Sequence, residues 1–252
     1  MSKEMSLMKL LAKFSIALAA LCFGLLLFAI LELAHQHELM HSVHPNPQNE
    51  EQENSEEYPF VDWDYWLAVN PDIVGWISIP ETEVNYPVVH APQSDPYYYL
   101  THDVFGNWNY LGCIYLDAQC NENFANNLNA VLFGHNLGFG DSSMFATLTK
   151  YLDESYAKEH SRVFIQTPQE QYCYTIAGAR ILQGDEQTKR IVFDGNKDFE
   201  RWKNEQLQAC QTPGTAPSRQ GSMMISLCTC SYFQQENERT VVYALYDTSS
   251  SV

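Results

Sequence analysis

Two cysteines and an arginine lie at the ends of neighbouring strand-like runs, where they could carry out thiol chemistry. Cys228 and Cys230 end a run of apolar and β-branched residues, and Arg239 opens the next such run. If the two runs pair as antiparallel strands, the turn between them brings Arg239 back beside the cysteines. A guanidinium in that place would stabilise a thiolate and, later, the oxyanion of a tetrahedral intermediate.

An imidazole is the third group that such chemistry needs. His135 follows a strand-like run that ends at Phe133, and Gly134 between them allows a close approach of the backbone. A histidine at the end of a strand can act as a general acid or base near neutral pH. Cysteine, histidine and arginine together predict a thiol-dependent acyl transfer.

Short runs rich in β-branched and aromatic residues must position these groups. Eight such runs lie in the region that carries them, and Pro, Asn or Gly separates many of the runs. This pattern predicts a mainly β fold, either a barrel or a sandwich. The runs are residues 74–79, 84–90, 111–116, 129–133, 163–166, 172–182, 223–227 and 240–246.

Three short helices are expected among the strands. The first begins after an N-cap at Asp62 and ends before the proline that follows Asn70. Apolar residues at spacings of three and four predict a second helix around 145–152, capped by Asp141 or Ser142. A third helix is expected over residues 197–209.

The N-terminal run has the composition of a membrane anchor. Residues 14–31 carry no charge, three lysines precede them, and Glu32 follows. Eighteen helical residues span about 27 Å, which is close to the roughly 30 Å of a bilayer core. Because the lysines all precede the run, the N-terminus is expected in the cytoplasm and the rest of the chain outside the cell.

Two alternatives to an uncleaved, single-pass anchor stay open. Signal-peptide cleavage would use the small-x-small sequence at residues 17–19, which lies in the middle of the run. Lipidation would use Cys22, but the preceding Leu21 is large for that position. We therefore favour the uncleaved anchor.

The chain divides into three parts by composition. Residues 1–34 form the cytoplasmic tip and transmembrane anchor, residues 35–57 an acidic extracytoplasmic linker, and residues 58–252 the catalytic domain. Four histidines of the linker, at positions 35, 37, 41 and 44, could be read as metal ligands, but no Cys or Asp flanks them. We expect no metal site there.

Composition excludes several classes of function. The 31 acidic and 14 basic residues give a formal net charge of −17, which excludes a nucleic-acid partner that is bound by counterion release. Hydrophobic residues make up 45% of the chain, enough for a packed core. The seven cysteines are odd in number and scattered, so a disulfide scaffold is not expected.

Several motifs, taken in order, resemble those of the class B sortases. The resemblance runs from about residue 65 to residue 246 and implies an eight-stranded β-barrel. It also implies an N-terminal helix, a further helix before the penultimate strand, and a membrane anchor with the catalytic domain outside. The motifs are residues 85–89 and 99–100, Phe-Gly-His-Asn at 133–136, Ser-Met-Phe at 143–145, and residues 225–232 with 239–242.

The resemblance also assigns the site residues. The family signature Leu-Ser-Thr-Cys reads Leu227-Cys228-Thr229-Cys230 here, so Cys230 is the implied nucleophile, with His135 and Arg239 as its catalytic partners. The implied substrate-binding residues are Leu100, Asn136, Cys228 and Thr229.

Two residues depart from the family pattern. Cys228 replaces the serine of the signature, and period-two geometry puts it on the same strand face as Cys230. A role in the substrate groove, sensitivity to oxidation and a strained disulfide with Cys230 all stay open for Cys228. Pro96 stands where class B members commonly have Asn after Ser-Asp, and it cannot supply that amide.

The implied activity is that of a cysteine transpeptidase without a cofactor or a metal. Such an enzyme cleaves a C-terminal sorting motif of a secreted protein after Thr, through a thioacyl intermediate. It then joins the protein to an amine of a cell-wall precursor peptide or of a pilin lysine. Two alternatives are a thiol hydrolase, in which water accepts the acyl group, and a non-catalytic surface-binding module. Retention of Cys, His and Arg argues against the second alternative.

Overall fold

The computed structural model describes residues 2–41, 43, 58–138, 142–183, 189–216, 223–230 and 237–247, and of Cys230 it describes the backbone. The chain forms two compact units, Met1–Ser42 and Val43–Val252. The predicted linker boundaries at 34/35 and 57/58 stay a prediction, since residues 44–57 lie outside the described residues.

The first unit is one helix, α1 (Ser2–His41). The most apolar 18 residues of its segment Lys13–Leu39 have a mean hydropathy of 2.7, and none of them is buried. By length and composition this segment can cross a membrane. The uncharged run predicted from the sequence lies within it.

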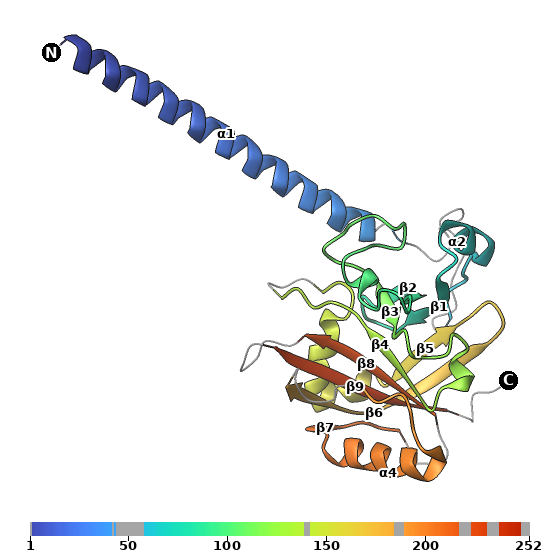
Figure 1. The fold of residues 1–252 in the computed structure, drawn as a ribbon. Helices are drawn as coiled ribbons and strands as arrows, with labels where there is room; N and C mark the ends of the chain where they lie inside the picture. The colour runs from blue at the N-terminus through green and yellow to red at the C-terminus, as the bar shows by residue number, and fades with distance from the viewer. Residues whose placement is uncertain are drawn as a thin grey trace. The chain divides into compact units, whose positions relative to one another are not determined.

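The second unit is built on a closed β-barrel (Figure 1). Its described residues form the strands β1 (Ile73–Ser78), β2 (Asn85–His90), β3 (Ile114–Leu116), β4 (Asn129–Phe133), β5 (Arg162–Gln166), β6 (Gln171–Gln183), β7 (Thr212–Pro213), β8 (Met224–Cys230) and β9 (Glu238–Tyr246). Eight of them pair in the order β5-β1-β2-β3-β4-β8-β9-β6, and a β5–β6 pairing closes the ring. The predicted eight-stranded barrel is therefore confirmed.

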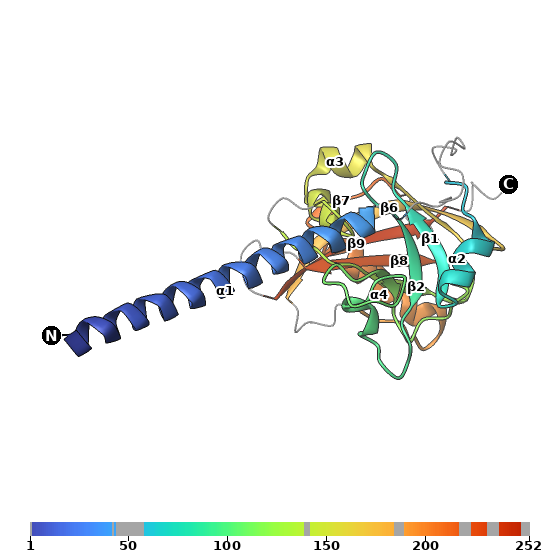
Figure 2. The ribbon, with the colours of Figure 1, turned by 90° about the horizontal axis from the view of Figure 1, so that it is seen from above.

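All eight predicted runs lie in or overlap the barrel strands, whereas β7 was not predicted. This two-residue strand pairs with the edge of β6. The pairings β2–β3 and β4–β8 are parallel, and the other pairings are antiparallel. β8 consequently lies between β4 and β9, and it runs beside β9 in both views (Figure 2).

Helices lie before and between the strands of this unit along the chain. The helices of this unit are α2 (Trp63–Val69), η1 (Tyr98–Leu100), η2 (Phe124–Asn126), η3 (Ala146–Leu152), α3 (Glu154–Glu159) and α4 (Gly195–Gln208), of which the η helices are 3-10. α2 begins as predicted, because the Asp62 carboxylate accepts the Tyr65 N–H at 3.0 Å. α4 is the predicted helix before the penultimate strand.

The second predicted helix differs from the expectation in type and cap. Residues 146–152 form the 3-10 helix η3, whose N-cap position is Phe145 and has no side-chain cap bond. Ser142 is thus not its cap, and Asp141 lies outside the described residues. A separate cap at Asp153 starts α3 by accepting the N–H groups of Ser155 and Tyr156.

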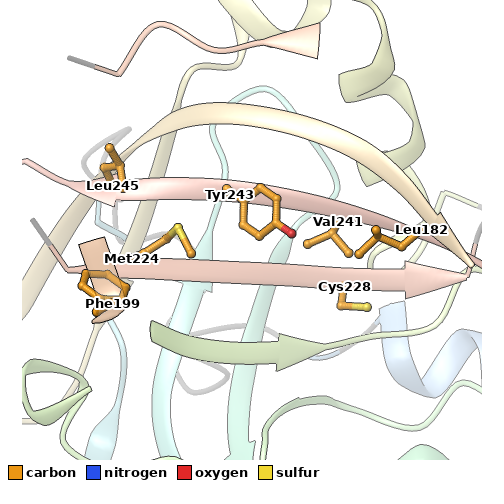
Figure 3. Packing of buried hydrophobic residues seen from close by; sticks show 7 residues of the cluster. All are labelled: Leu182, Phe199, Met224, Cys228, Val241, Tyr243 and Leu245. Atoms are coloured by element: carbon orange, nitrogen blue, oxygen red, sulfur yellow. The ribbon is translucent and has the colours of Figure 1, made fainter. Parts of the chain in front are cut away.

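The face of the barrel that α4 covers holds a buried cluster from β6, α4, β8 and β9 (Figure 3). Because strand residues alternate between faces, Met224 and Cys228 share this face on β8, and Arg239 continues it on β9. Arg239 is also the register partner of Cys230. The cluster consists of Leu182, Phe199, Met224, Cys228, Val241, Tyr243 and Leu245.

Candidate active site

A cavity of about 280 Å³ lies where β4, β8 and β9 end side by side. Five residues predicted for the site contribute to its wall: Leu100, His135, Cys228, Thr229 and Arg239. Two of the three predicted catalytic side chains, the imidazole of His135 and the guanidinium of Arg239, therefore share one cavity. The backbone of Cys230 lies directly opposite Arg239 in the β8–β9 register.

The His135 imidazole is held by a backbone carbonyl. Its Nε2 lies 2.7 Å from the oxygen of Leu100. Because a carbonyl oxygen can only accept, the neutral ring must carry its hydrogen on Nε2. The other ring nitrogen, Nδ1, is then the basic one and can accept a proton.

Burial and charge set the protonation state of His135. Burial lowers the pKa of His135 below its ordinary value of 6.5, the bond to Leu100 opposes this change, and the positive charge of Arg239 adds to it. The imidazole is therefore mainly neutral at pH 7. A neutral imidazole is the form that can take a proton from a thiol.

The backbone around His135 is fixed by three further bonds. The Gly134 N–H donates to Cys228 O at 3.2 Å, and the Phe145 N–H donates to His135 O at 3.0 Å. The Thr229 hydroxyl donates to Gly134 O at 2.8 Å. A Cβ on Gly134 would lie 2.8 Å from the Phe145 ring, which explains why this position needs glycine.

Arg239 is the second residue of β9 and is half-buried. Its Nη1 donates to the carbonyl of Glu238 at 3.0 Å, which fixes the side chain against its own strand. The positive charge lines the cavity and is close enough to His135 to lower the pKa of that group. A fixed cation in a half-buried position can stabilise a developing oxyanion.

The four predicted substrate-binding residues differ in their surroundings. Leu100 is 36% exposed and lines the cavity, as does Cys228, which is 1% exposed. The Thr229 hydroxyl is committed to Gly134 O. The Asn136 side chain accepts the Gly138 N–H at 3.0 Å, and Asn136 is not among the described residues that line the cavity.

Other lining residues were not identified as site residues from the sequence. Tyr97 is 69% exposed, and Tyr115 stacks on Phe133 with ring centroids 5.4 Å apart. Asp117 and Lys189 form an ion pair although 72 positions separate them, and no local sequence signal indicates such a pair. Pro96, noted as a departure from the family pattern, also lines the cavity.

Comparison with known proteins places this site in a family. A family model described as the sortase domain matches residues 77–247. Sortase B of Listeria monocytogenes is 28% identical over 162 residues, which are 64% of each chain. Sortase B of Staphylococcus aureus is 26% identical over 174 residues, which are 69% of each chain. The match to the Listeria protein thus spans slightly less than two thirds of its length.

Solved structures show the same fold. A Staphylococcus aureus sortase B–substrate complex superposes with a TM-score of 0.65 at 25% identity, over 73% of this chain and 84% of that one. Clostridium perfringens sortase B superposes with a TM-score of 0.67 at 23% identity, over 73% and 98%. The family model covers well over half of the sequence. The chain belongs to the sortase family, and its resemblance within that family is to the sortases of class B.

Proposed function

We propose that this chain is a cysteine transpeptidase that cleaves a sorting motif near the C-terminus of a secreted protein after Thr. Cys230 is the nucleophile, His135 the general base and acid, and Arg239 the group that stabilises the oxyanion. The acyl group is then passed to an amine of a cell-wall precursor peptide or of a pilin lysine. Sortases as a family are cysteine transpeptidases, which supports this assignment.

The single observation that carries the proposal is the meeting of three strand ends. β8 ends at Cys230, with Arg239 of β9 opposite it in register. His135 follows β4, the other neighbour of β8. Because His135 and Arg239 line one cavity, a carbonyl bound there lies within reach of both groups.

The neutral imidazole supports a simple sequence of proton transfers. Nδ1 of His135 accepts the thiol proton of Cys230, and the thiolate attacks the threonine carbonyl carbon of the substrate. The oxyanion that forms faces the guanidinium of Arg239. When the tetrahedral intermediate collapses, the C–N bond breaks and the imidazolium returns the proton to the leaving amine.

The second half of the reaction reverses these steps with a new amine. The thioester carbonyl is attacked by the acceptor amine, whose proton passes to His135. Collapse of the second tetrahedral intermediate forms the new peptide bond and expels the thiolate. Net chemistry is the exchange of one amine for another, so no cofactor takes part.

The apolar helix α1 supports a location of the protein in the cell membrane. The apolar segment Lys13–Leu39 would hold the enzyme in the cell membrane as a single pass. With lysines at positions 3, 9 and 13, the N-terminus would be cytoplasmic and the catalytic unit extracellular. Proteins that carry sorting motifs pass through this same compartment.

The proposal is tested by mixing the full-length protein in detergent with labelled peptides and an amine. One solved neighbour is a complex with substrate and another a complex with triglycine, so peptides ending in Asn-Pro-x-Thr-Gly or Leu-Pro-x-Thr-Gly and triglycine are suitable probes. Mass spectrometry should find the peptide joined to triglycine. Cleavage without joining would make the protein a hydrolase, and no cleavage of any library peptide would refute the proposal.

Two matched cysteine variants identify the nucleophile. Cys230→Ala should lower kcat by about 10⁴-fold or more, since the acyl-accepting sulfur is gone. Cys228→Ser, two residues away on the same strand face, should keep most of the activity. The opposite outcome would assign the nucleophile to Cys228.

A further inference from the structure

Thr229 contributes to the cavity wall, but its hydroxyl donates to a backbone carbonyl of the neighbouring loop. We infer that Thr229 is a positioning residue, whose hydroxyl holds the peptide unit between Gly134 and His135 and thereby aims the imidazole. This inference rests on the proposed function, because it concerns the general base of that reaction. Its test below has a readout that does not depend on activity.

Thr229 lies on the opposite face of β8 from the residues before and after it. Cys228 lies on the face of β8 that α4 covers, and alternation turns Thr229 to the opposite face. Its register partner across β8–β9 is Thr240. Both threonines are buried, at 2% and 0% exposure, so the hydroxyl of Thr229 is withdrawn from solvent.

The hydroxyl of Thr229 has a definite partner in this buried position. Its Oγ1 donates to the Gly134 carbonyl oxygen at 2.8 Å. That carbonyl belongs to the planar peptide unit that also contains the His135 nitrogen. A bond to the oxygen therefore fixes the tilt of the unit from which the imidazole projects.

The other constraints on this segment come from the backbone. The Gly134 N–H donates to Cys228 O and the Phe145 N–H donates to His135 O. Of the three bonds, the one from Thr229 is made by a side chain and can be removed by substitution. Loss of this bond lets the peptide unit rotate about the two that remain.

Small rotations matter because the imidazole is held at both ends. Its Nε2 must stay at 2.7 Å from Leu100 O for the basic Nδ1 to keep its direction. A misplacement of about 1 Å in a catalytic group can lower a rate by about 10²-fold. Thr229 also directly precedes Cys230, so one residue ties the position of the base to the strand end that carries the nucleophile.

The test compares Thr229→Val, which keeps the shape but removes the hydroxyl, with Thr229→Ser, which keeps the hydroxyl. The full-length protein is labelled with ¹⁵N-histidine, its ring nitrogens are titrated by NMR, and a His135→Asn variant assigns the His135 signals. In Thr229→Val the pKa of His135 should move towards 6.5, because the released ring is better hydrated. Arg239, Lys189 and Asp117, the charged groups that line the same cavity, are unchanged in these variants.

Kinetics give the second readout. Thr229→Val should lower kcat by about 10²-fold while KM changes less than about 3-fold, since valine keeps the shape of the cavity wall and only the support of the base is lost. Thr229→Ser should restore kcat to within about 3-fold of the wild-type value and leave the His135 titration in place. A substrate-binding role predicts the reverse pattern, with a raised KM and an unchanged His135 pKa, and that result would overturn the inference.

Thr240→Val is the matched control. Thr240 is the cross-strand neighbour of Thr229, and among the described residues its buried hydroxyl has no hydrogen-bond partner. The control should leave the His135 titration as in the wild type, so a shift as large as that of Thr229→Val would also refute the inference. If Thr229→Val does not fold, the smaller Thr229→Ala variant is titrated in its place. Should the chain prove to lack transpeptidase activity, the NMR comparison still decides the positioning role.

Discussion

Arg239 affects His135 through its positive charge, and both residues line the same cavity. The guanidinium lowers the pKa of the imidazole, and burial of the ring does so more strongly. Because the neutral ring is the form that accepts a proton, activity should fall as the pH drops through this lowered pKa. The acid limb of the pH–rate profile should therefore lie below pH 6.5.

Substitution of Arg239 separates its charge from its shape. Arg239→Met should raise the pKa of His135, since one of the two effects that lower it is removed, while Arg239→Lys should leave it low. Both variants should lose kcat, by about 10²-fold or more, because a lysine cannot reproduce the planar fork of donors. NMR titration and steady-state kinetics on the same samples check both statements, and an unchanged His135 pKa in Arg239→Met would contradict the first.

The sequence was sufficient to identify the two cavity residues His135 and Arg239 but not to place Thr229. Period-two alternation, which we applied to Cys228 and Cys230, already implies that Thr229 between them faces the other way. What the sequence could not supply was the partner of its hydroxyl, Gly134 O, which lies 95 positions away. The Asp117–Lys189 pair was missed for the same reason, since only the folded ring brings these residues together.

Runs rich in β-branched and aromatic residues located the strands, and turn residues separated them. β7 was not predicted, because its two residues, one of them Pro213, are too few to form a recognisable strand-like run. The helix around 145–152 was expected from its apolar spacing, but a 3-10 helix has a similar spacing at this short length. Strand partners, above all the parallel β4–β8 pair, depend on closure of the whole ring and have no local signature.

The tight packing around Gly134, which directly follows β4, leaves no room for a larger residue. In Gly134→Ala the new methyl would contact the Ile114 side chain and lie 2.8 Å from the Phe145 ring, so either the ring or the strand end must shift. We expect a loss of about 1–3 kcal/mol in the free energy of unfolding. Urea denaturation of the two proteins measures this difference.

Gly138→Ala in the same loop is the control for that variant. Gly138 has a φ of +71°, and a methyl group added there would meet no heavy atom of the described residues within 4 Å. Only the backbone preference is lost, at about 1 kcal/mol. A Gly134→Ala protein as stable as wild type would show that the Phe145 ring can move away from residue 134 without cost.

The apolar helix and the barrel belong to separate compact units. The exposed apolar side chains of α1 include Leu21 and Leu25, near the middle of its membrane-length segment. Replacing both by lysine should abolish membrane retention, because each charge near the bilayer centre costs about 2.5–3.5 kcal/mol. Alkaline extraction of membranes and immunoblotting measures retention.

Leu21→Ile with Leu25→Ile is the matched control and should stay in the membrane fraction. If the lysine variant also stays there, something other than this helix holds the protein to the membrane. The barrel unit should fold equally well in both variants, which circular dichroism and the peptide assay can verify.

The place of β8 between β4 and β9 has a consequence for synthesis on the ribosome. The ring has an open seam beside β4 until β8 has emerged, and the guanidinium arrives still later, on the last strand. In a growing chain His135 therefore emerges well before Cys230 and Arg239, which β8 and β9 bring to the same end of the barrel. Pairings this distant in sequence form slowly. Under the proposed function, the Cys230 thiol therefore meets Arg239 only after β9 has paired with β8.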